Sequence, residues 1–235
     1  AIANIVIADN QMFSNNGWSS EGLAHQPTIR LASSTNAVVD NVLVARNHLE
    51  GGFAVVTHKP VDTSAQAALG RLLFERNTLI ASRNSVAFLD IGSSGGVYRN
   101  NLLYRPASGP GPLIGFQAAF DMDFFSDSLQ DQQRRNYVYN NTLVMMPQQN
   151  NPAGSLVQIT GAQAPLGFPL RNNLAVFPAS QAASLLDFAP THDDLSLLEA
   201  DHNLVHAPNT SGHFVRRVGQ SLNLAAWQAL GQGTG

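Results

Sequence analysis

The chain has 235 residues, of which only 12% are charged, and its formal net charge is −3. Its 13 basic residues form no run that could follow a phosphate backbone, which disfavours nucleic-acid binding. No apolar stretch approaches the roughly 20 residues that a membrane-spanning helix needs. The chain has no cysteine, which excludes disulfides and thiolate metal sites.

One local pattern recurs along the chain: a short β-rich run, then an asparagine, then an aliphatic residue. The copies are Asp9-Asn10-Gln11-Met12, Arg46-Asn47-His48-Leu49, Arg76-Asn77-Thr78-Leu79, Arg99-Asn100-Asn101-Leu102, Asn140-Asn141-Thr142-Leu143, Arg171-Asn172-Asn173-Leu174 and Asp201-His202-Asn203-Leu204. We align them at positions 10, 47, 77, 100, 141, 172 and 202, so that a histidine takes the asparagine position in the last copy. A repeat of this length predicts a solenoid.

Each repeat also contains a second β-rich run, in which apolar and polar residues alternate. Examples are Thr28-Ile29-Arg30-Leu31 and Leu156-Val157-Gln158-Ile159. Alternation predicts strands with one buried face, and the intervening segments lack the periodicity of a helix. We therefore predict an all-β protein, a parallel β-helix of about seven coils over residues 1–206. Residues 207–235 are predicted to be a closing segment.

The recurrent asparagine has a structural role in this fold. Asparagine tolerates the left-handed backbone of a bend between two strands, and its amide can bond to the next coil in a ladder. The aliphatic residues that follow are predicted to stack inside the solenoid. That predicted column is Met12, Leu49, Leu79, Leu102, Leu143, Leu174 and Leu204.

The repeats resemble those of right-handed parallel β-helix proteins, which include pectate lyases, alginate and chondroitin lyases, epimerases and phage tailspikes. The resemblance covers roughly residues 3–206 and implies a right-handed solenoid, typical of secreted or cell-surface bacterial proteins. Solenoid ends need polar caps, and no such segment precedes Ile5. We therefore expect the natural chain to begin upstream of residue 1.

A narrower resemblance is to the lyase family that contains chondroitinase B and several alginate lyases. It rests on Ile29-Arg30-Leu31, then Val56-Thr57-His58-Lys59, then Leu89-Asp90-Ile91-Gly92. The resemblance implies that Lys59 is the base, that Arg30 neutralises the uronate carboxylate, with His58 assisting, and that calcium binds nearby. Two positions depart from the family: Asp90 replaces an arginine and Ala54 replaces a calcium-binding glutamate.

A column of polar residues is predicted on the outer face of the second strands. Its members are Arg30, Asp90, Asp121, Gln158 and Asp187. Such a stripe offers donors and acceptors to a sugar chain, so we assign substrate contacts to Asp90, Gln158 and Asp187. The alternative is an ordinary solvated strand face.

Three further features allow both a functional and a structural interpretation. Asp121 and Asp123 alternate with apolar neighbours and supply the oxygen ligands that calcium prefers, or belong to an acidic surface loop. Trp18 lies in a loop, where it stacks on a sugar or packs against the coil. His58 and Lys59 form a base site or a solvated turn before Pro60.

Two functional hypotheses follow. The first is a secreted protein that binds an acidic polysaccharide or cleaves it by β-elimination. The second is a non-catalytic structural or adhesive segment of a larger surface protein or fibre, which the residues Ala54 and Asp90 favour.

Overall fold

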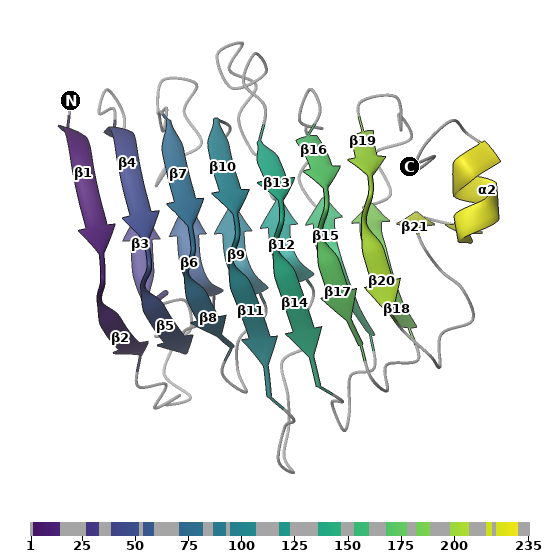
Figure 1. The fold of residues 1–235 in the computed structure, drawn as a ribbon, viewed down its shortest axis with the longest axis horizontal. Helices are drawn as coiled ribbons and strands as arrows, with labels where there is room; N and C mark the ends of the chain where they lie inside the picture. The colour runs from purple at the N-terminus through teal and green to yellow at the C-terminus, as the bar shows by residue number, and fades with distance from the viewer. Residues whose placement is uncertain are drawn as a thin grey trace, which may run out of the picture.

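A computed structural model gives the fold, and every structural statement below concerns the residues that it describes. These are residues 2–14, 27–32, 39–51, 54–58, 71–81, 87–92, 95–106, 118–122, 136–146, 153–159, 168–177, 182–188, 198–206, 215–217 and 220–229. They form three sheets wound into one solenoid (Figure 1).

Each coil of the solenoid contributes one strand to each sheet. Sheet A contains β1 (Ile2–Ala8), β4 (Val39–Ala45), β7 (Leu72–Glu75), β10 (Gly96–Arg99), β13 (Tyr137–Tyr139), β16 (Phe168–Arg171) and β19 (Leu198–Asp201). Sheet B contains β2 (Gln11–Ser14), β5 (His48–Gly51), β8 (Thr78–Ile80), β11 (Leu102–Arg105), β14 (Thr142–Met145), β17 (Leu174–Val176) and β20 (Leu204–His206). Sheet C contains β3 (Ile29–Leu31), β6 (Ala54–His58), β9 (Ala87–Ile91), β12 (Ala118–Met122), β15 (Ala153–Ile159), β18 (Ala182–Phe188), β21 (Val215–Arg217) and β22 (Gln220–Leu222).

The predicted fold class is confirmed. Strands of successive coils pair in parallel throughout sheets A and B, and the two sheets have seven strands each. In Figure 1 the chain runs down through sheets A and B at the front, returns upward in sheet C behind them, and advances to the right with each coil. The solenoid is therefore right-handed.

The corner between sheets A and B is held by a ladder of asparagines, as the repeats predict. Its members are Asn10, Asn47, Asn77, Asn101, Asn141, Asn173 and Asn203. In each step the backbone N–H and the side-chain amide of one asparagine donate to the Oδ1 of the next, as from Asn47 to Asn77 at 2.9 and 3.0 Å. Five of the seven side chains are buried, so the ladder satisfies polar groups that water does not reach.

The alignment of the repeats is wrong by one residue in three copies. The asparagine alignment at 100, 172 and 202 marks the left-handed residue that precedes the ladder, not the ladder position itself. The expectation that one asparagine serves both the bend and the ladder is therefore wrong, because the left-handed residue precedes the ladder asparagine in every copy. At this corner the left-handed residues, with φ between 54° and 61°, are Asp9, Arg46, Arg76, Asn100, Asn140, Asn172 and His202. The last copy therefore keeps its ladder asparagine, Asn203, and its histidine lies at the bend.

The same slip changes the predicted aliphatic column. The residues that stack inside at this position are Met12, Leu49, Leu79, Leu103, Leu143, Ala175 and Val205. Leu102, Leu174 and Leu204 lie on the outer face instead, and Leu102 and Leu204 are 42% and 64% exposed. Side chains in a strand alternate between the two faces, so a shift of one residue moves each leucine from the core to the surface.

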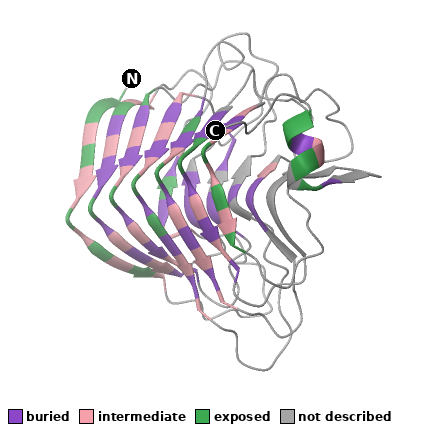
Figure 2. Ribbon diagram, turned by 45° about the vertical axis from the view of Figure 1, so that its right-hand side comes forward, coloured by how far each residue is buried: buried purple, intermediate pink, exposed green. Residues whose placement is uncertain are grey.

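The core lies between the three sheets, and buried residues alternate with more exposed ones along the strands (Figure 2). Near its middle Tyr98 packs between Phe74 and Phe120, with ring centroids 6.2 and 5.9 Å away. Arg105 is also buried, and desolvation lowers its pKa to about 10.

Sheet C continues beyond residue 206 and ends differently from the other two sheets. Strand β21 pairs in parallel with β18, whereas β22 pairs with β21 in antiparallel fashion. Helix α2 (Leu224–Ala229) follows, and the side chain of Asn223 accepts from the N–H of Ala226 at 2.8 Å as an N-cap. Trp227 on this helix is fully buried. No helix of the described residues is long and apolar enough to cross a membrane.

Candidate functional site

The pairing register of sheet C brings the predicted polar residues level with one another in one column. The pairing register places Arg30, Thr57, Asp90, Asp121, Gln158, Asp187 and Arg216 at the same position of successive strands. Neighbouring strands lie about 4.8 Å apart, so the column is a continuous row across seven coils. Sequence reasoning found five of these residues and missed Thr57 and Arg216. Thr57 follows an inward valine, Val56, which is the signal that could have identified it.

The column differs in exposure along its length. Arg30 is exposed between the buried residues Ile29 and Leu31, which establishes that this position faces outward. Thr57 is only 8% exposed, and the Oε1 of Gln158 is buried without a hydrogen-bond partner. A buried acceptor of this kind costs about 1–3 kcal/mol unless another group satisfies it. The column is therefore open to solvent at Arg30 and shielded at Thr57 and at the amide oxygen of Gln158.

The predicted base site falls at the C-terminal end of β6. The backbone of His58 pairs with Leu31 and Ile91, which are buried, rather than with Arg30. The residue level with Arg30 and Asp90 is Thr57. Lys59 lies outside the described residues, as do Trp18 and Asp123.

Of the two residues predicted to hold calcium, Asp121 lies in the middle of this column, and Asp123 lies outside the described residues. Backbone pairing sets Asp121 directly between Asp90 and Gln158 on adjacent strands, with Asp187 one strand further. Carboxylate oxygens are ligands that Ca²⁺ prefers, so the residue types at the adjacent positions 90 and 121 fit the ion. Among the side chains that the structure describes, no group of three histidines or acids could hold a metal.

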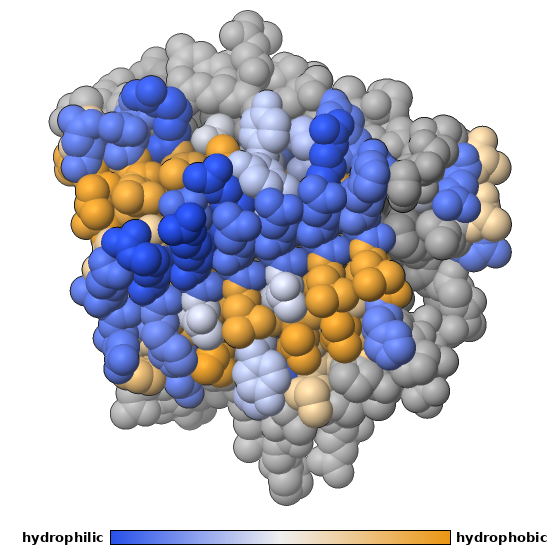
Figure 3. Space-filling view, viewed as in Figure 1, coloured by the Kyte–Doolittle hydropathy of each residue, from blue (hydrophilic) through white to orange (hydrophobic). Residues whose placement is uncertain are grey.

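A second surface feature lies on the outer face of sheet A, and the sequence did not predict it. It is a hollow of about 660 Å³ that crosses the first strands of the sheet, and we call it the trough. Its floor is an aliphatic row formed by Val6, Leu43, Leu73 and Val97, which the strand register aligns along the solenoid axis. Figure 3 shows apolar surface here, between hydrophilic residues above and below it.

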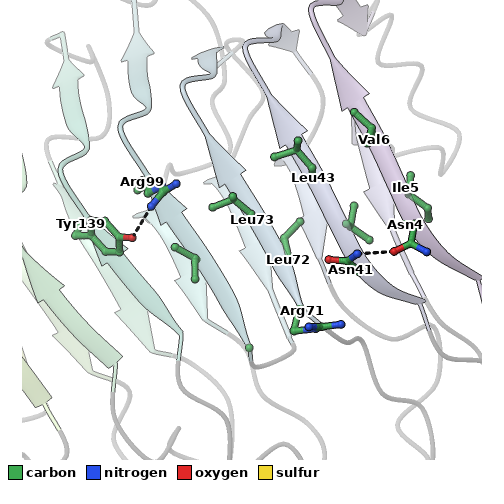
Figure 4. A pocket seen from close by; sticks show the side chains of 13 residues that line it. Asn4, Ile5, Val6, Asn41, Leu43, Arg71, Leu72, Leu73, Arg99 and Tyr139 are labelled. Atoms are coloured by element: carbon green, nitrogen blue, oxygen red, sulfur yellow. Dashed lines mark hydrogen bonds between the residues drawn. The ribbon is translucent and has the colours of Figure 1, made fainter.

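Polar side chains form the two sides of the trough (Figure 4). On one side the amide of Asn41 donates to the Oδ1 of Asn4, and Arg71 lies one coil further. On the other side the guanidinium of Arg99 donates to the hydroxyl of Tyr139 at 3.2 Å. The trough therefore combines an apolar floor with hydrogen-bonding groups at both edges.

Both arginines of the trough are paired with carboxylates. Arg99 contacts Glu75 at 2.6 Å, and its pKa is raised by its hydrogen bonds to Tyr139 and Glu75. Arg71 contacts Asp40 at 3.3 Å, and the hydrogen bonds from Arg71 lower the pKa of Asp40 to about 2. The positive charges at the edges of the trough are thus already neutralised by the protein.

No family model, curated protein or solved structure matches this chain.

Proposed function

We propose that this β-helix binds an acidic polysaccharide along the polar column of sheet C. The observation that carries the proposal is the register, which sets seven residues of polar type at the same position of successive strands. A row of equally spaced groups suits a polymer with a regular repeat better than it suits a single small molecule. The resemblance to secreted bacterial β-helix proteins supports an extracellular or cell-surface location.

The two ends of the column and its centre would make different contacts with such a polymer. Arg30 at one end is exposed and can pair with a uronate carboxylate, and Arg216 has the equivalent position at the other end. The central aspartates repel a polyanion unless a cation lies between them. A calcium ion between the neighbouring positions Asp90 and Asp121 would supply that bridging charge.

If the protein is catalytic, the chemistry would be β-elimination at a uronate. Lys59 would remove the proton next to the carboxylate, and Arg30 would neutralise that carboxylate, with His58 assisting. This assignment follows the resemblance to the chondroitinase B and alginate lyase family. Ala54 and Asp90 depart from that family, and they favour a protein that binds without cleaving.

Two measurements test the proposal on alginate, polygalacturonate and chondroitin sulfate, each with and without calcium. Calorimetry measures binding to the wild type, to Arg30→Ala and to Arg171→Ala, a control on sheet A whose arginine is also solvent-exposed. We expect saturable binding to at least one polymer, weakened by Arg30→Ala only. Absence of binding to all three polymers, or equal loss in both variants, would contradict the proposal.

The second measurement follows the absorbance of the unsaturated product, with Lys59→Ala as the control. Product that depends on Lys59 supports a lyase. Binding without product identifies a non-catalytic protein and favours the structural or adhesive alternative. The burial of Thr57, next to the predicted base site, supports binding without catalysis, because it limits the access of a reacting sugar to that site.

A further inference from the structure

We propose that the trough on sheet A is a second glycan site, which binds a neutral polysaccharide lying along the solenoid axis. This site is on a different sheet from the polar column and does not depend on the function proposed there. Its ligand class follows from three properties of the trough: its direction, its floor and the state of its charges.

The direction of the trough suits an extended polymer. Val6, Leu43, Leu73 and Val97 come from four consecutive coils and form one row. Strands of adjacent coils lie about 4.8 Å apart, so the row advances by one aliphatic side chain over about that distance. A chain of pyranose rings in an extended conformation advances by a similar step and can set one ring against each coil.

The floor of the trough suits the apolar face of a sugar ring. Val6 is 66% exposed, and Leu43, Leu73 and Val97 are half-buried, so all four retain surface that water covers in the free protein. Covering this surface with the C–H face of a sugar releases that water, which favours binding. The trough continues to Tyr139, whose ring and hydroxyl combine apolar and polar contacts.

The edges of the trough suit hydroxyl groups. Asn4 and Asn41 present amide groups at one edge, and the hydroxyl of Tyr139 is at the other. Because this hydroxyl accepts from Arg99, its own hydrogen can be donated to a sugar oxygen. The two sides together offer the donors and acceptors that ring hydroxyls need.

The paired charges of the trough favour a neutral ligand over an anion. Arg71 and Arg99 are the charged residues that line it, and each is paired with a carboxylate, Asp40 or Glu75. An acidic polymer would have to break these pairs to use the arginines, whereas a neutral one would leave them intact. The ligand is therefore an uncharged glycan.

Calorimetric titration of the protein with cellohexaose and with xylohexaose tests this proposal. Leu73→Asp places a charge on the floor of the trough, and Tyr139→Phe removes only a hydroxyl. Val144→Asp is the matched control, because Val144 is a half-buried outward residue on sheet B. Circular dichroism and thermal unfolding establish that each variant is folded.

We expect saturable binding of at least one neutral hexasaccharide. Leu73→Asp should weaken it about tenfold or more, and Tyr139→Phe about threefold to tenfold, the loss expected for one hydrogen bond. Val144→Asp and Arg30→Ala should leave it unchanged. If Leu73→Asp does not fold, Tyr139→Phe decides the question alone.

Three results would overturn the proposal. They are the absence of saturable binding to both sugars, binding that neither trough variant weakens, and tighter binding of hexagalacturonate that the trough variants weaken. The Arg30→Ala variant separates the two sites, since it should affect only acidic polymers. If the polar column on sheet C binds no acidic polymer, the test of the trough is unaffected. If the trough binds no neutral glycan, the test of the polar column is equally unaffected.

Discussion

Asn47 donates two hydrogen bonds to the Oδ1 of Asn77, from its backbone N–H at 2.9 Å and from its side-chain amide at 3.0 Å. The side chain of Asn77 in turn donates to the carbonyl of Val44 at 2.9 Å and to Asn101. The buried side chain of Asn77 therefore hydrogen-bonds to Val44 and Asn47 on the preceding coil and to Asn101 on the following coil. The ladder holds neighbouring coils in register through such residues.

Replacing Asn77 by alanine should destabilise the fold by about 3 kcal/mol. The substitution leaves the N–H of Asn47 and the carbonyl of Val44 buried without these partners, and each unsatisfied group costs about 1–3 kcal/mol. Urea unfolding followed by circular dichroism measures the change. Asn10→Ala is the matched control, because Asn10 occupies the first ladder position and is only half-buried. A loss for Asn10→Ala as large as that for Asn77→Ala would contradict this account.

The close approach of Gly96 and Tyr98 gives a second prediction. A Cβ atom on Gly96 would lie 2.5 Å from the ring and hydroxyl of Tyr98, and that ring is confined by Phe74 and Phe120. Gly96→Ala should therefore destabilise the protein by about 1–3 kcal/mol through overpacking. Adding Tyr98→Leu should make the Gly96→Ala substitution less costly, because the smaller side chain leaves room for the new methyl group. Additive losses in this double-mutant cycle would show that the two residues do not conflict.

The ion pair of Asp40 and Arg71 predicts part of the acid sensitivity of the protein. The pKa of Asp40 is about 2 in the folded state, below the ordinary value of 3.8, because Arg71 donates to the carboxylate from its side chain and its backbone. The contribution of this ion pair to the free energy of unfolding is complete at pH values above the ordinary pKa of 3.8, and it is lost as the pH falls toward 2. The pair is solvent-exposed, so we expect it to stabilise the fold by only about 0.2–1 kcal/mol.

Asp40→Asn tests this contribution, since asparagine keeps an oxygen that can accept from the N–H of Arg71. The difference in unfolding free energy between about pH 6 and about pH 2.5 should be smaller in the variant than in the wild type. An unchanged difference would show that other carboxylates account for the acid response.

Much of this structure is predictable from the sequence because the fold repeats. The asparagine before an aliphatic residue identifies the coils, and the alternation in the second strands identifies the outward column from Arg30 to Asp187. The trough on sheet A escaped prediction for a related reason. Leu43 and Leu73 lie next to inward residues, Val42 and Leu72, so the apolar pairs read as undivided β-rich runs. Only the register shows that one member of each pair faces outward.

The register itself is the part that the sequence predicted least well. At Asn100-Asn101 and Asn172-Asn173 two asparagines are adjacent, and an asparagine is compatible with either position, the bend or the ladder. Local preference cannot choose between them, because the choice depends on the pairing with the neighbouring coils. The wrong choice predicted Leu102 as a core residue in place of Leu103.

Leu102 and Leu103 therefore provide a direct test of the register. Leu103 is fully buried and aligns with Leu79 and Leu143, so Leu103→Ala should cost about 2–5 kcal/mol through lost burial and the cavity that remains. Leu102 is 42% exposed on the outer face, and Leu102→Ala should change stability by no more than about 0.5 kcal/mol. Urea unfolding of the two variants compares the same substitution at adjacent positions. A larger loss for Leu102→Ala would restore the alignment that places the first asparagine of the pair, Asn100, in the ladder.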